Sequence, residues 1–153
     1  MRKRRSTRST HSARGCPTTA TSFGEQSYTI SAHDLHNGGN LSISATVTVQ
    51  GDTATAKPLR SVLLFLSREA SADAVGGLPP RIEWLGDFTK LRSFDGGKAT
   101  AHLMLGAEAL SRWVPTAGGA ESKSFTAGSY LVQTGEYTLR LTDSTATAKL
   151  SVT

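Results

Sequence analysis

The residues best suited to a chemical role lie in the first fourteen positions of the chain. Six cationic side chains stand there among serines and threonines, and no acidic residue occurs before Glu25: Arg2, Lys3, Arg4, Arg5, Arg8 and Arg14. Guanidinium and ammonium groups pair with phosphates through charge-assisted hydrogen bonds and release condensed counterions. Because no aromatic residue is interleaved with these cations, the pattern predicts neutralisation of a phosphate backbone without reading of bases.

The positive charge of the chain belongs to this segment and not to the rest. The formal net charge of the 153 residues is +5, and the six cations account for more than all of it. Residues 1–24 show no hydrophobic periodicity and are rich in Arg, Ser and Thr, so we expect a disordered basic arm. Residues 25–153 are nearly neutral and long enough for one hydrophobic core, so we expect a single folded domain there. A neutral body with a cationic arm indicates a polyanionic partner, of which nucleic acid is the commonest.

Apolar and polar residues alternate in most of the folded part, which is typical of half-buried strands. Leu41–Val49 and Lys98–Leu105 alternate most regularly, and both are bounded by glycine-rich turns. Val62–Leu66 is a continuous apolar run, which favours a strand buried on both faces. Gly106–Val114 has the spacing of a short helix. The pattern as a whole predicts an all-β protein, an antiparallel sandwich or barrel built from seven to nine short strands.

The aromatic residues are few and fall mostly in the expected strands. We therefore expect them in the core and not on a base-stacking platform: Phe65, Trp84, Phe88, Trp113, Tyr130 and Tyr137. Trp113, two residues before Pro115, could instead contact another subunit.

Signals of catalysis or of metal binding are weak. His33 and His36 lie in an expected turn, but a zinc site needs further ligands, and the single cysteine, Cys16, lies in the arm. Asp87 and Asp95 flank an expected strand end, where a divalent cation between subunits is the one cofactor worth considering. No Ser, His and acid arrangement has an identifying motif. We expect a protein that is not an enzyme and holds no metal of its own.

The single cysteine and the lengths of the apolar runs indicate in which compartment we expect the protein and whether we expect it in a membrane. A single cysteine cannot form an intrachain disulfide, which fits a reducing compartment or an assembly that does not depend on disulfides. No apolar run approaches the ~20 residues of a membrane span, and no apolar segment follows the basic residues as in a signal peptide. We therefore expect a protein that is neither secreted nor bound to a membrane.

Three segments of the body, together with the arm, resemble coat proteins of small isometric positive-strand RNA viruses. The segment SYTISAHDLHNGGNLSISATV, residues 27–47, is similar to the opening of the shell domain of luteoviruses and poleroviruses. SVLLFLSREASADAVGG, residues 61–77, resembles a central strand and loop of the same domain. GEYTLRLTDS, residues 135–144, is similar to the last shell strand of sobemovirus-like coats. A compact coat of the satellite-virus type fits equally well.

This resemblance implies a jelly-roll sandwich that binds copies of itself. Such a capsid protein would be a structural protein that self-assembles into an icosahedral shell and packages single-stranded RNA through the basic arm. Its place would be the virion, and the host cytoplasm during assembly. Arg2, Lys3, Arg4, Arg5, Arg8 and Arg14 would be the RNA-binding residues.

A different resemblance competes with this one. PRIEWLGDFTKL, residues 80–91, is similar to the Trp-bearing strand of immunoglobulin-like domains. TGEYTLRLTDSTATAKLSV, residues 134–152, resembles their last two strands, with a tyrosine corner at Tyr137 and Leu139 in the place of the usual cysteine. About thirty residues separate Val49 from Ile82, where that fold has a short loop. The sequence thus leaves two alternatives to the viral coat, an immunoglobulin-like binding module and a cellular RNA-binding or ribonucleoprotein β-sandwich.

Overall fold

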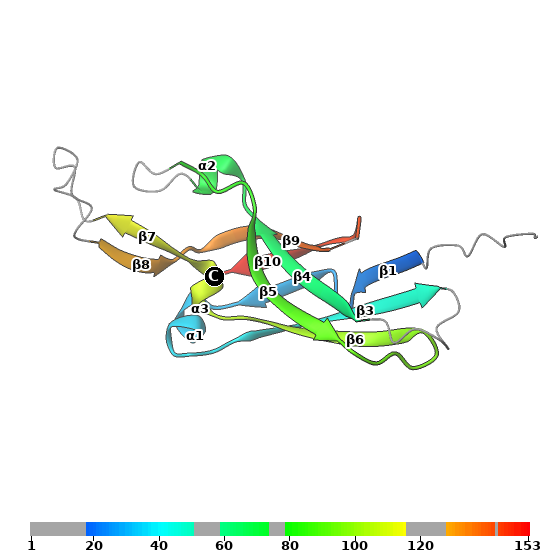
Figure 1. Ribbon diagram of the computed structural model, residues 1–153. Helices are drawn as coiled ribbons and strands as arrows, with labels where there is room; N and C mark the ends of the chain where they lie inside the picture. Colours follow the sequence, from blue (N-terminus) through cyan, green and yellow to red (C-terminus); the bar gives the residue numbers. More distant parts are fainter. Residues whose placement is uncertain (1–17, 51–58, 74–78, 116–127, 143) are drawn as a thin grey trace, which may run out of the picture.

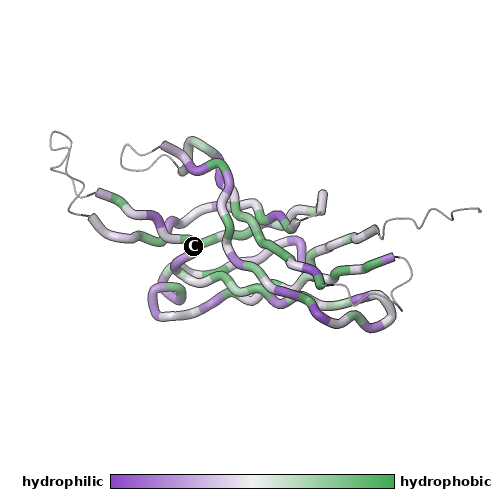
Figure 2. Tube along the Cα trace, viewed as in Figure 1, coloured by the Kyte–Doolittle hydropathy of each residue, from purple (hydrophilic) through white to green (hydrophobic). Residues whose placement is uncertain are grey.

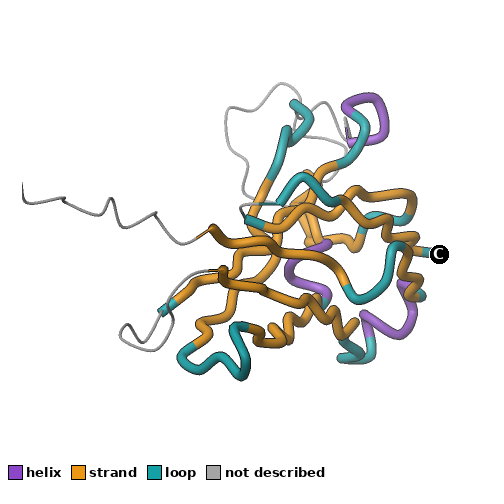
Figure 3. The backbone as a smooth tube through the Cα atoms, turned by 90° about the vertical axis from the view of Figure 1, so that its right-hand side faces the viewer, coloured by secondary structure: helices purple, strands orange, loops and turns teal. Residues whose placement is uncertain are grey.

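A computed structural model describes residues 18–50, 59–73, 79–115, 128–142 and 144–153 (Figure 1). Strands make up most of this part of the chain, and its helices are short (Figure 3). The all-β prediction is therefore confirmed. The six cations of the arm and Cys16 lie outside the described residues. No helix in the described ranges combines the length and the apolar character that a membrane span requires.

Two sheets form a sandwich, and a separate hairpin extends from it. The first sheet has three antiparallel strands in the order β1 (Thr18–Phe23), β3 (Leu41–Gln50) and β6 (Lys98–Leu105). The second has five, in the order β2 (Ser27–Ile30), β10 (Thr147–Val152), β9 (Gly135–Leu141), β4 (Arg60–Ser67) and β5 (Trp84–Leu91). The hairpin pairs β7 (Ser111–Pro115) with β8 (Gly128–Val132). In Figure 1 the hairpin points away from the sandwich. Among the described strands, the β2–β10 pair is the one that is parallel.

The core lies between the two sheets and follows the alternation of the sequence. β3 buries Ile43, Ala45, Val47 and Val49, and its other side chains are half-buried or exposed, as the sequence predicts. The facing sheet contributes alternate residues of β4, β9 and β10: Val62, Leu64, Leu66, Tyr137, Leu139, Leu141, Ala148, Leu150 and Val152. Burial of one such aliphatic side chain contributes about 1.5–3 kcal/mol. Apolar and polar residues alternate along the strands in Figure 2 as this period-two pattern requires.

The described chain begins as a strand earlier than the sequence indicates. β1 covers Thr18–Phe23, which falls inside the range assigned to the disordered arm, 1–24. It pairs antiparallel with β3 from Thr18 opposite Gln50 to Phe23 opposite Ala45. The many threonines and serines of this segment favour neither a core nor a helix. Threonine nevertheless has a high β-propensity, and the edge of β3 supplies the hydrogen-bond partners for a strand. The boundary of the folded body is therefore nearer to residue 18 than to residue 25.

Two segments have a different local structure from the one predicted. The expected turn at residues 32–40 begins with a helix, α1 (Ala32–His36), because the Ser31 hydroxyl oxygen accepts hydrogen bonds from the N–H groups of His33 and Asp34. The expected helix at residues 106–114 ends after one turn, as α3 (Ala107–Leu110), and the chain continues as β7. Pairing with β8 outweighs the local helical pattern there. A third one-turn helix, α2 (Ala70–Asp73), follows β4.

The strand order does not confirm the predicted jelly roll. β4 and β5, and likewise β9 and β10, are neighbours in sequence that pair side by side within one sheet. A jelly roll is built from two Greek keys across two sheets. Strand pairing depends on contacts between residues far apart in the chain, and the alternation pattern of single strands does not specify it.

A bulge between β4 and β5 positions the side chains at the edge of the larger sheet. The register shifts after Leu64, so that Phe65 lies opposite Leu85 and Leu63 lies opposite Phe88. Gly86 lies at the irregularity, and a Cβ atom there would stand 2.1 Å from Cδ1 of Leu66, which only glycine avoids. Because of this extra residue, Leu85 and Phe88 both lie on the outer face of the sheet although they are three positions apart.

Candidate interaction surfaces

One end of the sandwich is rich in cations. β1, β4 and β6 begin there and β3 and β5 end there, at the right of Figure 1. Among the described residues this end carries Arg60, Lys90, Arg92 and Lys98, with Asp95 as its acid. None of these cations has a recorded ion pair in the part of the chain that the structure describes. Among the described residues, this end therefore carries more cations than acids.

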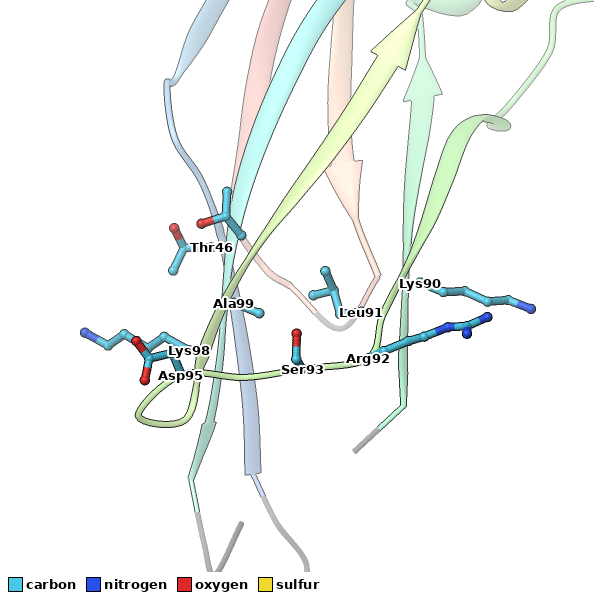
Figure 4. Close-up of a pocket in the computed structure, with 9 residues that line it drawn as sticks. Thr46, Lys90, Leu91, Arg92, Ser93, Asp95, Lys98 and Ala99 are labelled. Carbon is cyan, nitrogen blue, oxygen red and sulfur yellow. The ribbon is translucent and has the colours of Figure 1, made fainter. Parts of the chain in front are cut away.

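An open cavity of about 730 Å³ lies at this end, between the last residues of β5 and the first residues of β6. Lys90 and Arg92 extend together on one side of it, and Asp95 and Lys98 lie on the other side (Figure 4). Its remaining lining is small or aliphatic, with hydroxyl groups but without an aromatic ring: Thr46, Leu91, Ser93, Ala99 and Thr100. Such a surface can attract an anion but offers no platform on which a base or sugar ring could stack.

The predicted RNA-binding residues lie outside the part of the chain that the structure describes. Arg2, Lys3, Arg4, Arg5, Arg8 and Arg14 precede the described residues. β1 follows them, and its first residue, Thr18, lies opposite Gln50 at the cationic end. The chain of the arm therefore joins the sandwich at the end that carries the other cations.

A second cavity, of about 500 Å³, lies near α1, α3 and the bulge of β5. Asp87 and Glu108 are the acids among its lining residues. The Asp87 carboxylate accepts a hydrogen bond from the backbone N–H of Met104 on β6, at 2.6 Å. Asp87 therefore caps the free edge of the opposite sheet.

Metal-binding side chains do not gather in the described residues. No group of three or more His, Cys, Asp or Glu side chains there could hold a metal ion. Asn37 Nδ2 lies 3.0 Å from Nε2 of His33, so this ring has a side-chain partner on its own turn. A divalent cation between subunits stays a prediction that no observation on the single chain tests.

Two aromatic residues expected in the core form a packed cluster. Tyr137 is buried and donates a hydrogen bond to the backbone oxygen of Gln133, four residues upstream. Trp84 meets the Tyr137 ring edge-on at a centroid distance of 6.1 Å and donates to the Ala109 oxygen at 2.8 Å. Arg81 stacks on Trp84 at 3.8 Å from the ring centroid. The predicted tyrosine corner is confirmed as a hydrogen bond, and both rings have a packing role.

A surface that the sequence did not reveal lies on the outer face of β4 and β5. Leu63 and Phe65 of β4 and Leu85 and Phe88 of β5 form it, and we call these four residues the outer strip. Leu85 is 46% and Phe88 56% exposed, which contradicts the expectation that Phe88 lies in the core. Tyr130 of β8 is also exposed and not in the core. The register shift at the bulge was the missing signal, because it decides which residues of β5 face outwards.

An ion pair borders the outer strip. Arg140 of β9 donates two hydrogen bonds of 2.9 Å to the carboxylate of Glu83, and its guanidinium lies 4.9 Å from the centroid of the Phe65 ring. The hydrogen bonds from Arg140 hold the pKa of Glu83 below its ordinary value. The pair is largely open to solvent, so it contributes little stability but orients two charges beside the strip.

Comparison with known proteins identifies structural relatives but no sequence relatives. No family model matches the chain, and no curated protein matches it. The fold is similar to that of a β-glucosidase from Listeria innocua in complex with isofagomine, with a TM-score of 0.63 at 12% identity over 89% of this chain and 16% of that one. It is also similar to a GH3 β-glucosidase from Bifidobacterium adolescentis, with a TM-score of 0.57 at 20% identity over 89% of this chain and 17% of that one.

A yeast protein gives the same result. A β-glucosidase from Kluyveromyces marxianus matches with a TM-score of 0.59 at 17% identity, over 89% of this chain and 14% of that one. The chain thus spans about a sixth of the length of the structures that it matches. At these identities the similarity shows a shared fold.

Proposed function

We propose that this chain is a non-catalytic β-sandwich module of a glycoside hydrolase of the β-glucosidase type. The observation that supports this most strongly is the asymmetry of the structural matches. Nearly all of this chain, 89–90%, superposes on a small part, 14–17%, of β-glucosidases from bacteria and from a yeast. The same kind of sandwich therefore recurs as a small part of such enzymes in distant organisms. This recurrence supports a role for the sandwich that differs from the role of the other five-sixths of each enzyme.

The topology supports an immunoglobulin-type description of the module in place of a jelly roll. β1, β3 and β6 correspond to strands A, B and E of that fold, and β4, β5, β9 and β10 correspond to C, C′, F and G. Tyr137, at the start of the F strand, makes the hydrogen bond typical of a tyrosine corner. This assignment follows the immunoglobulin-like alternative of the sequence with one change. β4, which lies in the long connection between Val49 and Ile82, takes the place of strand C, and the Trp-bearing segment forms C′.

The arrangement of acids favours a supporting role over catalysis. Glycoside hydrolysis uses two carboxyl groups that flank the bond to be cleaved. In the described residues the larger cavity has Asp95 as its acid. The second cavity is lined by Asp87 and Glu108, and Asp87 is engaged by the backbone N–H of Met104. We therefore assign catalysis to another part of the enzyme, on which this module would pack.

The test is to isolate the chain from cells that express its gene, using an antibody raised against the 16.1 kDa protein. The precipitate is assayed with nitrophenyl β-glucoside and related β-glycosides, and precipitate from pre-immune serum serves as control. We expect β-glycosidase activity, with the sandwich either in a polypeptide several times larger or in a complex with one. A precipitate that contains the chain but no glycosidase activity would overturn the proposal.

A second candidate function, the binding of a polyanion, is favoured by the cationic end at which β1 begins. The predicted viral coat protein, which would self-assemble and package single-stranded RNA, is the specific form of this candidate and stays a prediction. If all six cations of the arm engage single-stranded RNA, log K should fall with log salt with a slope of about −4. A chain lacking residues 1–14 should fold and lose most of this salt dependence. RNA binding that is unchanged by the deletion would exclude the arm as the binding element.

A further inference from the structure

The two outer faces of the sandwich differ in chemistry. On the three-stranded sheet the outward side chains are mainly hydroxyls, with His102 and Met104 of β6 beside them: Ser42, Ser44, Thr46, Thr48 and Thr100. On the five-stranded sheet the outward side chains of β2, β9 and β10 are likewise polar or charged. Met104 is a single exposed apolar side chain on its face, whereas the outer strip gathers four apolar residues on one face. Its apolar residues are contiguous because cross-strand neighbours pair on the same face, Leu63 with Phe88 and Phe65 with Leu85.

A contiguous apolar strip on an otherwise polar surface indicates a contact with another protein surface. The strip does not support the fold of the sandwich from inside, since the core face of β4 is formed by Val62, Leu64 and Leu66. Gly86 adds to this argument. The bulge at this position turns both Leu85 and Phe88 outwards, at the cost of a regular β4–β5 register.

The charges around the strip indicate the character of the partner. Cations outnumber acids on the outward face of the larger sheet, which carries Lys90, Arg140 and Lys149 against Glu83 and Glu136. Interfaces place an apolar centre inside a polar rim, and complementary charges on the two rims fix the orientation. Arg140 and Glu83 pair with each other, so the excess on this face is one cation, and a complementary partner has an apolar patch with an acid on its rim.

We propose that the outer strip is the surface by which this module docks on the remaining, catalytic part of the hydrolase. This inference rests on the proposed function. The structural relatives supply the reason for this occupant, because about five-sixths of their chains lie outside the matching sandwich. A module of this size is held against a larger body through one interdomain interface, roughly 600–1,500 Å² in area, and the strip would form its centre.

Two residues with the same exposure allow a direct test. Phe88 in the outer strip and Met104 on the opposite outer face are each 56% exposed in the isolated sandwich. Hydroxyl-radical footprinting compares their rates of oxidation in the isolated 153-residue chain and in the hydrolase isolated with the antibody. We expect the rate at Phe88 to fall several-fold in the hydrolase and the rate at Met104 to stay unchanged. Equal rates at Phe88 in the two samples, or protection of Met104 alone, would overturn the docking surface.

A matched pair of variants tests the same surface by function. Phe88→Ser and Met104→Ser each remove an equally exposed apolar side chain, and both are introduced into the gene in cells that express it. We expect Phe88→Ser to lower the temperature at which the co-isolated glycosidase activity is lost, or to reduce the amount of activity several-fold, while Met104→Ser behaves as wild type. Circular dichroism of the isolated variant sandwiches serves to show that both fold.

The outcomes separate the two proposals. Absence of glycosidase activity from wild-type precipitate overturns the proposed function and, with it, this occupant of the strip. Activity in wild type together with an effect of Met104→Ser but not of Phe88→Ser overturns the docking surface alone. Sedimentation of the isolated chain as a dimer that Phe88→Ser dissociates would assign the strip to a second copy of this chain and overturn the hydrolase as its occupant.

Discussion

The two faces of β4 show how differently adjacent residues of one apolar run are used. Val62, Leu64 and Leu66 are buried between the sheets, whereas Leu63 and Phe65 lie half-buried on the outer face. The run Val62–Leu66 predicts a strand buried on both faces, and the structure of the single chain buries one. The inner face stabilises the fold, and the outer face is available for a partner. A continuous apolar run in a sequence therefore predicts a strand, but it does not show whether each residue of the run faces the core or a partner.

The largest expected difference between the two faces is in the free energy of unfolding. Leu64→Ala should lower it by about 2–5 kcal/mol, because a fully buried leucine leaves a cavity. Leu63→Ala, on the same strand, should lower it by less than about 1 kcal/mol, since its site faces outwards. Urea denaturation of both variants of the isolated chain measures the contrast. Equal losses would show that the outer face also supports the fold.

The tyrosine corner should show a smaller contrast of the same kind. Tyr137→Phe removes the hydrogen bond to the Gln133 oxygen and should lower the free energy of unfolding by about 1 kcal/mol. Tyr130→Phe on the exposed hairpin strand β8 is the control and should change it by no more than about 0.5 kcal/mol. Thermal and urea unfolding followed by circular dichroism measure both. A neutral Tyr137→Phe would mean that the corner contributes through packing alone.

The smallest expected effect comes from the ion pair beside the outer strip. Because the pKa of Glu83 is lowered in the folded protein by its hydrogen bonds with Arg140, the pair contributes stability above the ordinary pKa of 4.5. This contribution is lost as pH falls through the lowered pKa. In Glu83→Gln the urea midpoint should therefore fall slightly less between about pH 6 and about pH 3 than in wild type. Glu136→Gln, on the same face, is the control, and an identical effect of both substitutions would rule out a specific role of the pair.

The sequence by itself determined the class of fold and the facing of its most regular strands. Alternation along Leu41–Val49 and Lys98–Leu105 specifies which side chains are buried, because a strand has a period of two whatever its partners are. The upstream hydrogen bond of Tyr137 was also predictable, since a tyrosine at this place in a C-terminal pair of strands is a local signature. The concentration of charge in the arm follows from composition alone.

Only the tertiary structure decided how the strands pair and which apolar residues remain outside. The jelly roll and the immunoglobulin-type sandwich have the same kind of strands, and they differ in contacts between residues far apart in sequence, which local patterns do not encode. Residues 111–114, which the sequence predicts to be helical, form part of β7 because they pair with β8. At α1 a local signal decides instead, because the Ser31 cap starts a helix where the sequence predicts a turn. The exposure of Phe88 depends on a one-residue bulge at Gly86, because a single register shift reverses the face of every residue beyond it.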